Sequence, residues 1–277
     1  SVPVYSAFCD FPERYHINIK RGFDKDKIKK ENELNFKKLE QEVLKSRATK
    51  LIISGEDISV LPPRGVSNLR KYLTKHFSDK IRVIMYVRNP VSWAISNVQE
   101  MIKNGNTYRD SLNGTIHAVK NLLSGRIEKF VNEFGFNSVE IYTFEEAVQH
   151  KFGPAGHFLK LLGYNDDEMG YFDFVRGNES ISLLSANIIS YINEKVPLIK
   201  DNKINENRYY GDTHNLHFIR GPKFDIPLED KERIFENSRS DTEWLKEKYG
   251  IDYTDNPVTG NDLYFKFTDE IIADIRT

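Results

Sequence analysis

The chain has 277 residues, of which 39% are apolar, 29% charged and 12% aromatic, a mixture typical of a folded protein with a substantial core. Its formal net charge of −1 argues against a general attraction to nucleic acid or to an anionic membrane, so any anion-binding site must be local. Cys9 is the single cysteine, which excludes an internal disulfide, and no apolar run reaches the length of a membrane span. We therefore expect a cytoplasmic protein with no integral membrane segment and no nucleic-acid partner, and peripheral membrane attachment stays open.

Before residue 80 the sequence predicts two helices and two extended segments. In chain order these are a strand or extended segment over residues 2–8, an amphipathic helix over 28–46, a short buried strand over 50–54 and a helix over about 66–77. The strand over 50–54 would carry Glu56 and Asp57 at its carboxyl end. A carboxylate in that position is a candidate general base, and a helix-capping or salt-bridging acid is the alternative.

The clearest local pattern lies between residues 81 and 103. Residues 81–87 are apolar and rich in β-formers, which predicts a buried strand, and Arg88-Asn89-Pro90 forms the turn at its carboxyl end. Because proline presets the backbone of a first helical turn, a helix is expected from Pro90 to about Lys103. Ser96 lies eight residues beyond Arg88, roughly 12 Å along such a helix. An arginine at a strand end, with a hydroxyl and a helix N-terminus nearby, suits a phosphate.

The rest of the chain continues to alternate between helices and extended segments. The predictions are a helical region over about 112–134, a strand over 138–142, a short helix over 154–162, a strand or extended segment over 171–175, a helix from the N-cap Ser180 to about 194, a long loop over 195–226 and a helix over 227–249. This alternation favours an α/β fold with a parallel sheet covered by helices on both faces. Only the strands over 50–54, 81–87 and 138–142 are clear, which is few for an open sheet.

Arg88-Asn89-Pro90 followed by Ser96 resembles the 3′-phosphate-binding motif of the sulfotransferases that use 3′-phosphoadenosine 5′-phosphosulfate (PAPS). That motif is Arg-[Asp/Asn]-Pro, five residues and then Ser, behind a strand. The resemblance implies a P-loop-like three-layer αβα fold with a central parallel sheet. It also implies that Arg88 and Ser96 bind the 3′-phosphate of the donor. An ion pair at a strand end and a packed helix hydroxyl are the alternative interpretations of these two residues.

Other parts of the chain resemble the same family in their order. The strand over 50–54 corresponds in position to the strand that carries the catalytic base, which implies Glu56 in that role, with Asp57 as its rival. Phe144 stands where the family has the tyrosine of a Tyr-Glu pair near the adenine. Arg176 and Asn178 resemble an Asn-x-Ser stretch of bacterial carbohydrate-type members. A core aromatic is the commoner explanation for a residue such as Phe144, and a helix-start turn would explain Arg176 and Asn178 equally well.

One part of the family pattern is missing from this sequence. The loop that binds the 5′-phosphosulfate, Gly-x-x-Lys-[Ser/Thr]-Gly-Thr, is found nowhere in the chain. We expect that loop to lie upstream of Ser1, and a degenerate member that lacks it is the alternative.

The resemblance therefore predicts a bacterial PAPS-dependent sulfotransferase folded as one domain over residues 1–277. It would act on a hydroxyl or amine of a carbohydrate or glycolipid, release 3′,5′-diphosphoadenosine and require no metal. Residues 195–226 would form a lid or an acceptor-binding loop, and His214-x-x-His217 within it lacks a third ligand for zinc. A P-loop small-molecule kinase and a non-catalytic nucleotide-binding module are the alternatives, and a homodimer stays open.

Overall fold

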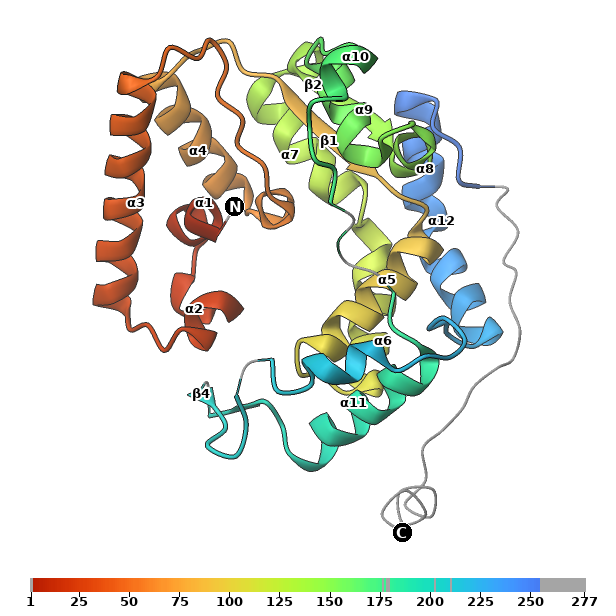
Figure 1. Cartoon of the computed structure of the whole chain (residues 1–277). Coiled ribbons are helices and arrows are strands. Elements are labelled where there is room, and N and C mark those ends of the chain that lie inside the picture. Colours follow the sequence, from red (N-terminus) through yellow and green to blue (C-terminus); the bar gives the residue numbers. More distant parts are fainter. Residues whose placement is uncertain (1, 176, 178–179, 202, 210, 255–277) are drawn as a thin grey trace. The chain divides into compact units, whose positions relative to one another are not determined.

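The computed structural model describes residues 2–254 apart from residues 176, 178–179, 202 and 210. In this part the protein is mixed α/β and mainly helical (Figure 1). The α-helices are α1 (Val2–Phe8), α2 (His16–Lys20), α3 (Lys25–Lys45), α4 (Pro63–His76), α5 (Pro90–Lys103), α6 (Tyr108–Ala118), α7 (Ser124–Phe134), α8 (Phe144–Gln149), α9 (Gly153–Leu161), α10 (Asp166–Met169), α11 (Leu183–Lys195) and α12 (Leu228–Tyr249). The strands are β1 (Val83–Val87), β2 (Val139–Thr143), β3 (Ile199–Lys200) and β4 (Lys203–Ile204), and the 3₁₀ helices are η1 (Pro12–Arg14), η2 (Glu56–Val60), η3 (Val119–Asn121), η4 (Phe136–Ser138) and η5 (His214–Phe218).

The chain folds into two compact units, and each is assembled from three separate stretches. Unit 1 takes its described residues from Ser1–Val83, Gly125–Glu140 and Ile199–Tyr210, and unit 2 from Ile84–Ser124, Ile141–Leu198 and Gly211–Thr277. Strands β1 and β2 pair in parallel, with most of each strand in unit 2. Strands β3 and β4 form a separate antiparallel hairpin in unit 1.

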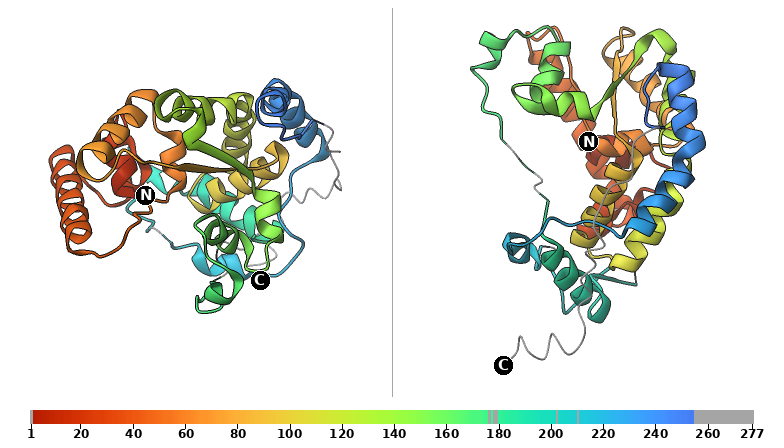
Figure 2. Two further views of the ribbon diagram at one scale, coloured as in Figure 1. Left: turned by 90° about the horizontal axis from the view of Figure 1, so that it is seen from above. Right: turned by 90° about the vertical axis from the view of Figure 1, so that its right-hand side faces the viewer.

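Four helices enclose the core of unit 2. Ala94, Val98 and Ile102 follow one another at four-residue intervals on α5 and are fully buried, as expected of an amphipathic helix. Ile189 of α11 and Ile234 of α12 are fully buried in the same core. The long α12 packs along α5 and α6 (Figure 2), so α5 is held on several sides.

Helix α1 corrects the prediction of a strand or extended segment over residues 2–8. Val4 is buried, and Phe8, one helical turn later, packs edge-on against Phe36 of α3 at a ring separation of 5.6 Å. A run of seven apolar-rich residues fits either period, and packing against α3 and α4 selects the helix. The approach to α4 is close, because a Cβ at Gly65 would collide with the carbonyl oxygen of Phe8.

Residues 50–54 are not a strand, which corrects a second prediction. They run as irregular chain, with Leu51 and Ile52 exposed by 40% and 51%. A strand needs a hydrogen-bonded neighbour, and no strand of the described part pairs with this segment. The expected three-stranded parallel sheet is therefore reduced to the β1–β2 pair, and a three-layer P-loop-like architecture stays a prediction.

Two helix boundaries also differ from the predictions. The helical region over 112–134 is interrupted between α6 and α7, where the carboxylate of Asp241 accepts hydrogen bonds from the backbone N–H groups of Leu123 and Ser124 at 2.5 and 2.9 Å. Helix α11 begins later than expected because Ser182, and not Ser180, is its N-cap, accepting a hydrogen bond from the N–H of Ser185 at 3.0 Å.

The remaining predictions divide between elements that form and segments that stay irregular. Residues 171–175 form no strand, which leaves the extended alternative. The predicted loop over 195–226 contains the β3–β4 hairpin and η5, and its role as a lid stays a prediction. No helix of the described residues is both long and apolar enough to cross a membrane.

Candidate functional site

Arg88 follows the last residue of β1, as the sequence predicts. Its guanidinium lies over the ring of Phe144, the first residue after β2, at 5.3 Å from the ring centroid. The side chain is half-buried, and this burial lowers the pKa of Arg88, although the nearby Glu145 carboxylate and Tyr253 act in the opposite direction. No described residue accepts a hydrogen bond or forms an ion pair with Arg88. The site thus holds a partly desolvated cation, supported by an aromatic ring, that forms no hydrogen bond or ion pair with a described residue although the charge of Glu145 acts on it.

The turn after Arg88 is fixed by the side chain of Asn89. Its Oδ1 accepts hydrogen bonds from the N–H groups of Val91 and Ser92 at 3.0 and 3.2 Å, so Asn89 is the N-cap of α5. This cap limits what the helix N-terminus near Arg88 can offer to a phosphate. Because two amides of the first turn already have an acceptor, α5 offers an anion its dipole and its side chains rather than these N–H groups.

Glu145 holds the same turn from the β2 side. One carboxylate oxygen accepts a hydrogen bond from the N–H of Asn89 at 3.0 Å, and the other accepts from the hydroxyl of Tyr253 at 2.6 Å. Burial and this hydrogen bond raise the pKa of Tyr253. The sequence placed Glu145 at the strand end but did not predict this positioning role, which depends on a tyrosine 108 residues away.

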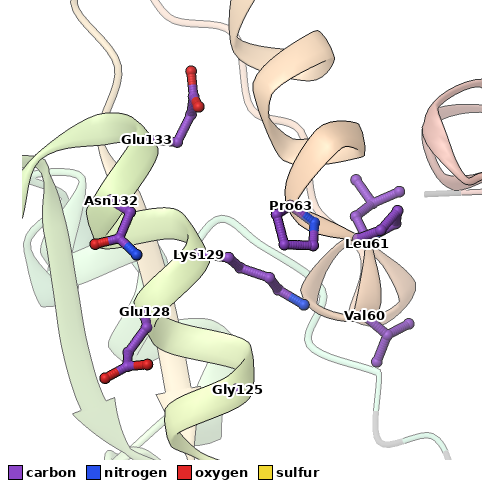
Figure 3. Close-up of a pocket in the computed structure, with 9 residues that line it drawn as sticks. Val60, Leu61, Pro63, Gly125, Glu128, Lys129, Asn132 and Glu133 are labelled. Atoms are coloured by element: carbon purple, nitrogen blue, oxygen red, sulfur yellow. The ribbon is translucent and has the colours of Figure 1, made fainter.

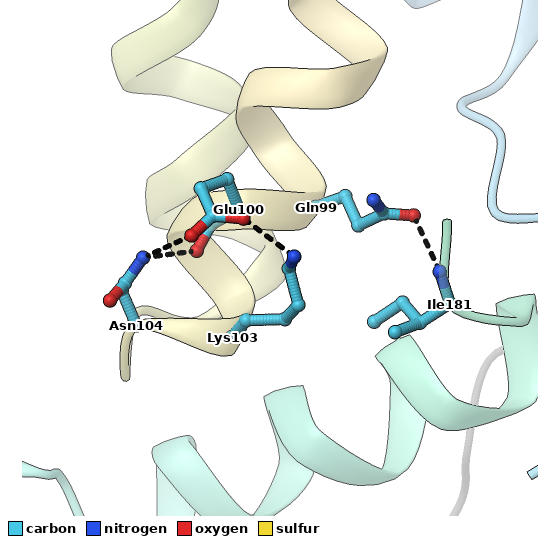
Figure 4. A network of polar contacts seen from close by, with 5 residues as sticks. All are labelled: Gln99, Glu100, Lys103, Asn104 and Ile181. Atoms are coloured by element: carbon cyan, nitrogen blue, oxygen red, sulfur yellow. Dashed lines mark hydrogen bonds and ion pairs between the residues drawn. The ribbon is translucent and has the colours of Figure 1, made fainter. Parts of the chain in front are cut away.

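Ser96 lies on α5 two helical turns beyond Arg88. Its side chain is half-buried, and its hydroxyl has no hydrogen-bond partner among the described residues. One turn further along α5, Gln99 accepts a hydrogen bond from the N–H of Ile181 at 3.0 Å (Figure 4). The predicted site residues Arg176 and Asn178 lie outside the described residues. The chain that follows them is nevertheless attached to the helix that carries Ser96.

Glu56 and Asp57 belong to unit 1, whereas Arg88, Ser96 and Phe144 belong to unit 2. Both acids lie in the first turn of η2 and not at a strand end. Asp57 accepts a hydrogen bond of 2.5 Å from the hydroxyl of the buried Tyr15, and burial together with this bond raises the pKa of Tyr15. Glu56 is exposed and forms no hydrogen bond or ion pair with a described residue. Of the two acids, Asp57 is therefore the one engaged by a hydrogen bond with a described residue.

Unit 1 also contains basic residues that the sequence did not single out. Arg126 and Lys129 lie one turn apart on α7, and the charge of Glu56 partly offsets the lowering of the pKa of Arg126 by burial. Lys129 lines a hollow of about 460 Å³ between α7 and the turn from η2 into α4 (Figure 3). Burial, and secondarily the charge of Arg126, lowers the pKa of Lys129 to about 8. The chemical signal in the sequence was weak because basic residues on a helix are usually solvated.

Comparison of the chain with protein-family models, with curated proteins and with solved structures finds no match. Within the described residues there is no group of three or more His, Cys, Asp and Glu side chains placed to hold a metal ion. The rings of His214 and His217 pack together, with 5.1 Å between their centroids. No third His, Cys, Asp or Glu of the described residues is placed to complete a metal site with them.

Proposed function

We propose that this protein is a PAPS-dependent sulfotransferase that moves a sulfuryl group to a hydroxyl or amine of a carbohydrate or glycolipid. The observation that carries the proposal is Arg88, a half-buried guanidinium at the carboxyl end of a parallel strand whose donors have no acceptor among the described residues. Ligands of α/β proteins bind beyond the carboxyl ends of parallel strands, and a planar guanidinium matches two phosphate oxygens at once.

In this proposal the 3′-phosphate of the donor is held by Arg88 and Ser96. Neither group has a hydrogen-bond partner among the described residues, so a phosphate would supply the acceptor for the guanidinium and for the hydroxyl. Phe144 fixes the orientation of Arg88 and offers a ring to the adenine. Arg176 and Asn178 stay candidate ligands through the resemblance alone, and the chain after them is anchored to α5 by the Gln99–Ile181 hydrogen bond.

In the transfer step, Glu56 is the base that takes the proton of the acceptor. As the acceptor oxygen or nitrogen forms its bond to sulfur, its proton passes to the Glu56 carboxylate, and the bond between sulfur and the bridging phosphate oxygen breaks. The products are the sulfated acceptor and 3′,5′-diphosphoadenosine. Exposure and the absence of a described hydrogen-bonding partner leave the carboxylate of Glu56 accessible to an acceptor. The 5′-phosphosulfate loop of the family is not found in this sequence, so roles are assigned only to residues for the 3′-phosphate, the adenine and the base.

Calorimetric titration of the chain with 3′,5′-diphosphoadenosine, with 5′-AMP and with ATP plus magnesium tests the donor. We expect the diphosphate to bind at least about tenfold more tightly than 5′-AMP, because charge-assisted hydrogen bonds to the 3′-phosphate are lost, and magnesium to have no effect. Equal affinities for 3′,5′-diphosphoadenosine and 5′-AMP would show that the protein has no 3′-phosphate site. A preference for ATP with magnesium would identify a kinase instead.

A non-catalytic nucleotide-binding module is the second candidate, because such a module would keep the 3′-phosphate site without needing a 5′-phosphosulfate loop. The two candidates differ in turnover rather than in 3′-phosphate binding. Incubation with radiolabelled PAPS and a mixture of polysaccharide acceptors separates them. Transfer of label that disappears in Glu56→Gln supports the enzyme, and binding of the diphosphate without any transfer supports the module.

A further inference from the structure

The hollow in unit 1 has two chemically different walls. One wall is apolar and comes from Val60, Leu61, Pro62 and Pro63, where η2 turns into α4. The other wall is polar and comes from α7, with Gly125, Glu128, Lys129, Asn132 and Glu133. The α7 positions recur at intervals of three and four residues, so they occupy one face of the helix. A volume of about 460 Å³ lies within the usual range of small-ligand sites.

Among the described residues that line this hollow, Lys129 is the one cation. Its side chain extends from α7 toward the turn that carries Val60 and Pro63 (Figure 3), and it is half-buried. No described carboxylate lies within ion-pair distance of its ammonium group, although Glu128 and Glu133 line the same hollow. Glu133 is engaged instead by Arg70 of α4, at 3.7 Å. A partly desolvated ammonium without a counter-ion is costly, and an anionic ligand would remove that cost.

The two walls together suit one class of ligand. A simple anion would use Lys129 but leave the apolar wall and the acceptor groups of Glu128 and Asn132 unused. A pyranose ring has C–H faces that pack on apolar surface and hydroxyls that donate to carboxylate and amide oxygens. We infer that this hollow binds an acidic saccharide, with its carboxylate on Lys129, its hydroxyls on Glu128 and Asn132, and one ring face against Val60, Pro62 and Pro63.

This inference rests on the proposed function only in making that saccharide the acceptor. Glu56, the proposed base, begins η2, and Val60 at the other end of the same 3₁₀ helix lines the hollow. At about 2 Å rise per residue these two positions are separated by about 8 Å along the helix axis. A sugar held in the hollow therefore places its neighbouring unit, or its own far hydroxyl, near the base.

The class of ligand is tested by titrating the full chain at pH 7 with glucuronate, glucose and acetate. Ligand-observed NMR measures the affinity for each. We expect glucuronate to bind at least about tenfold more tightly than either glucose or acetate. Lys129→Met should reduce glucuronate to the affinity of glucose, while Lys71→Met, an exposed lysine of α4 in the same unit, should bind like the wild type. Acetate binding as tightly as glucuronate, or an unchanged preference in Lys129→Met, would overturn the inference.

The pH dependence gives an independent measurement. Glu128 and Glu133 of α7 line the hollow with Lys129, and the charge of Arg126 acts on its ammonium. Arg70 of α4 pairs with Glu133, and Glu56 of η2 acts on Arg126. The pKa of Lys129 in the free protein is lowered to about 8, so glucuronate must bring a proton with it above that pH. Wild-type affinity should fall as pH rises from about 8 to about 10, whereas Lys129→Arg, which stays charged, should keep a level profile. A level wild-type profile would remove Lys129 from the site.

The donor titration distinguishes this inference from the proposed function. Binding of 3′,5′-diphosphoadenosine without glucuronate binding would overturn the acidic-saccharide site and leave the sulfotransferase proposal in place. Glucuronate binding that depends on Lys129, without diphosphate binding, would support the saccharide site and overturn the proposed donor.

Discussion

Arg88 is positioned by its neighbours rather than by an ion pair of its own with a described residue. Phe144 lies against the guanidinium, and Glu145 fixes the backbone of the following residue. Such an arrangement keeps the donors of a charged side chain available for a ligand, which an internal salt bridge would not. The ammonium group of Lys129 in unit 1 is likewise available to a ligand, because this half-buried cation forms no ion pair with a described residue.

Arg88→Ala should separate binding from stability. We expect the affinity for 3′,5′-diphosphoadenosine to fall by about 10- to 100-fold, as for the loss of charge-assisted hydrogen bonds, with little change in the melting temperature. Arg82→Ala is a matched control, because Arg82 is exposed and paired with Glu140 at 2.8 Å, so its removal should change neither quantity by much. Equal losses of affinity and stability in Arg88→Ala would indicate a structural junction.

The two acids of η2 should respond to substitution in opposite ways. Glu56→Gln should lower sulfuryl transfer by about a hundredfold or more, because the proton acceptor is removed. It should change stability little, because Glu56 is exposed and forms no hydrogen bond with a described residue; only its charge effect on Arg126 is lost. Asp57→Asn should retain most of the activity and lower the free energy of unfolding by about 1–3 kcal/mol, because it weakens the partly buried hydrogen bond from Tyr15. Activity assays and urea unfolding of both variants make the comparison. The reverse result would assign the base to Asp57.

Helix boundaries in this protein depend on side chains that are distant in sequence. Helix α5 is an exception, since Asn89 and Pro90 supply its cap and first turn locally. Helix α7 is the opposite case, because its first amides are satisfied by Asp241, which lies on α12. Local signals therefore predict the start of α5. No residue near the start of α7 predicts the interruption before it, because the acceptor comes from Asp241 on α12.

Removal of the Asp241 carboxylate should destabilise the start of α7. Asp241 is buried, so Asp241→Ala leaves the N–H groups of Leu123 and Ser124 without an acceptor and should cost about 2–3 kcal/mol. Asp241→Asn keeps one acceptor oxygen and should cost less. Urea unfolding followed by circular dichroism measures both variants, and a loss below about 0.5 kcal/mol in Asp241→Ala would show that water replaces the carboxylate.

At the scale of the whole chain, both units are built from stretches that are far apart in sequence. The prediction of a single domain over 1–277 used only the order of elements, which does not reveal such an arrangement. The core of unit 2 joins α5, α6, α11 and α12. Its stability and the candidate donor site therefore share α5, but they use different residues of that helix.

A core substitution should lower stability without lowering affinity for the donor, which is the opposite of the result expected for Arg88→Ala. Ile189 of α11 is fully buried in unit 2, so Ile189→Ala should lower the free energy of unfolding by about 2–5 kcal/mol through lost burial and a cavity. The affinity for 3′,5′-diphosphoadenosine should stay within about twofold of the wild type below the unfolding transition, a difference under roughly 0.5 kcal/mol. A large loss of affinity measured on folded protein would show that the core and the site are coupled.

The sequence by itself determined the elements whose signals are local. Apolar β-formers predicted β1 and β2, Pro90 predicted the start of α5, and Gly250, with a φ of 69°, ends α12 as expected of a left-handed C-cap. The same local pattern supplied Arg88 and Ser96 as candidate ligands. These predictions succeed for the elements because each depends on backbone preferences and hydrophobic period within a few residues.

Only the tertiary structure decided the features that depend on distant partners. It made residues 2–8 a helix by packing them against α3 and α4, and it left 50–54 without a strand neighbour in the described part of the chain. It also engaged Asp57 with Tyr15 and exposed Glu56, and it placed Lys129 in a hollow opposite two prolines. Burial and hydrogen-bond satisfaction are properties of the folded neighbourhood rather than of the local chain, so no spacing in the sequence specifies them.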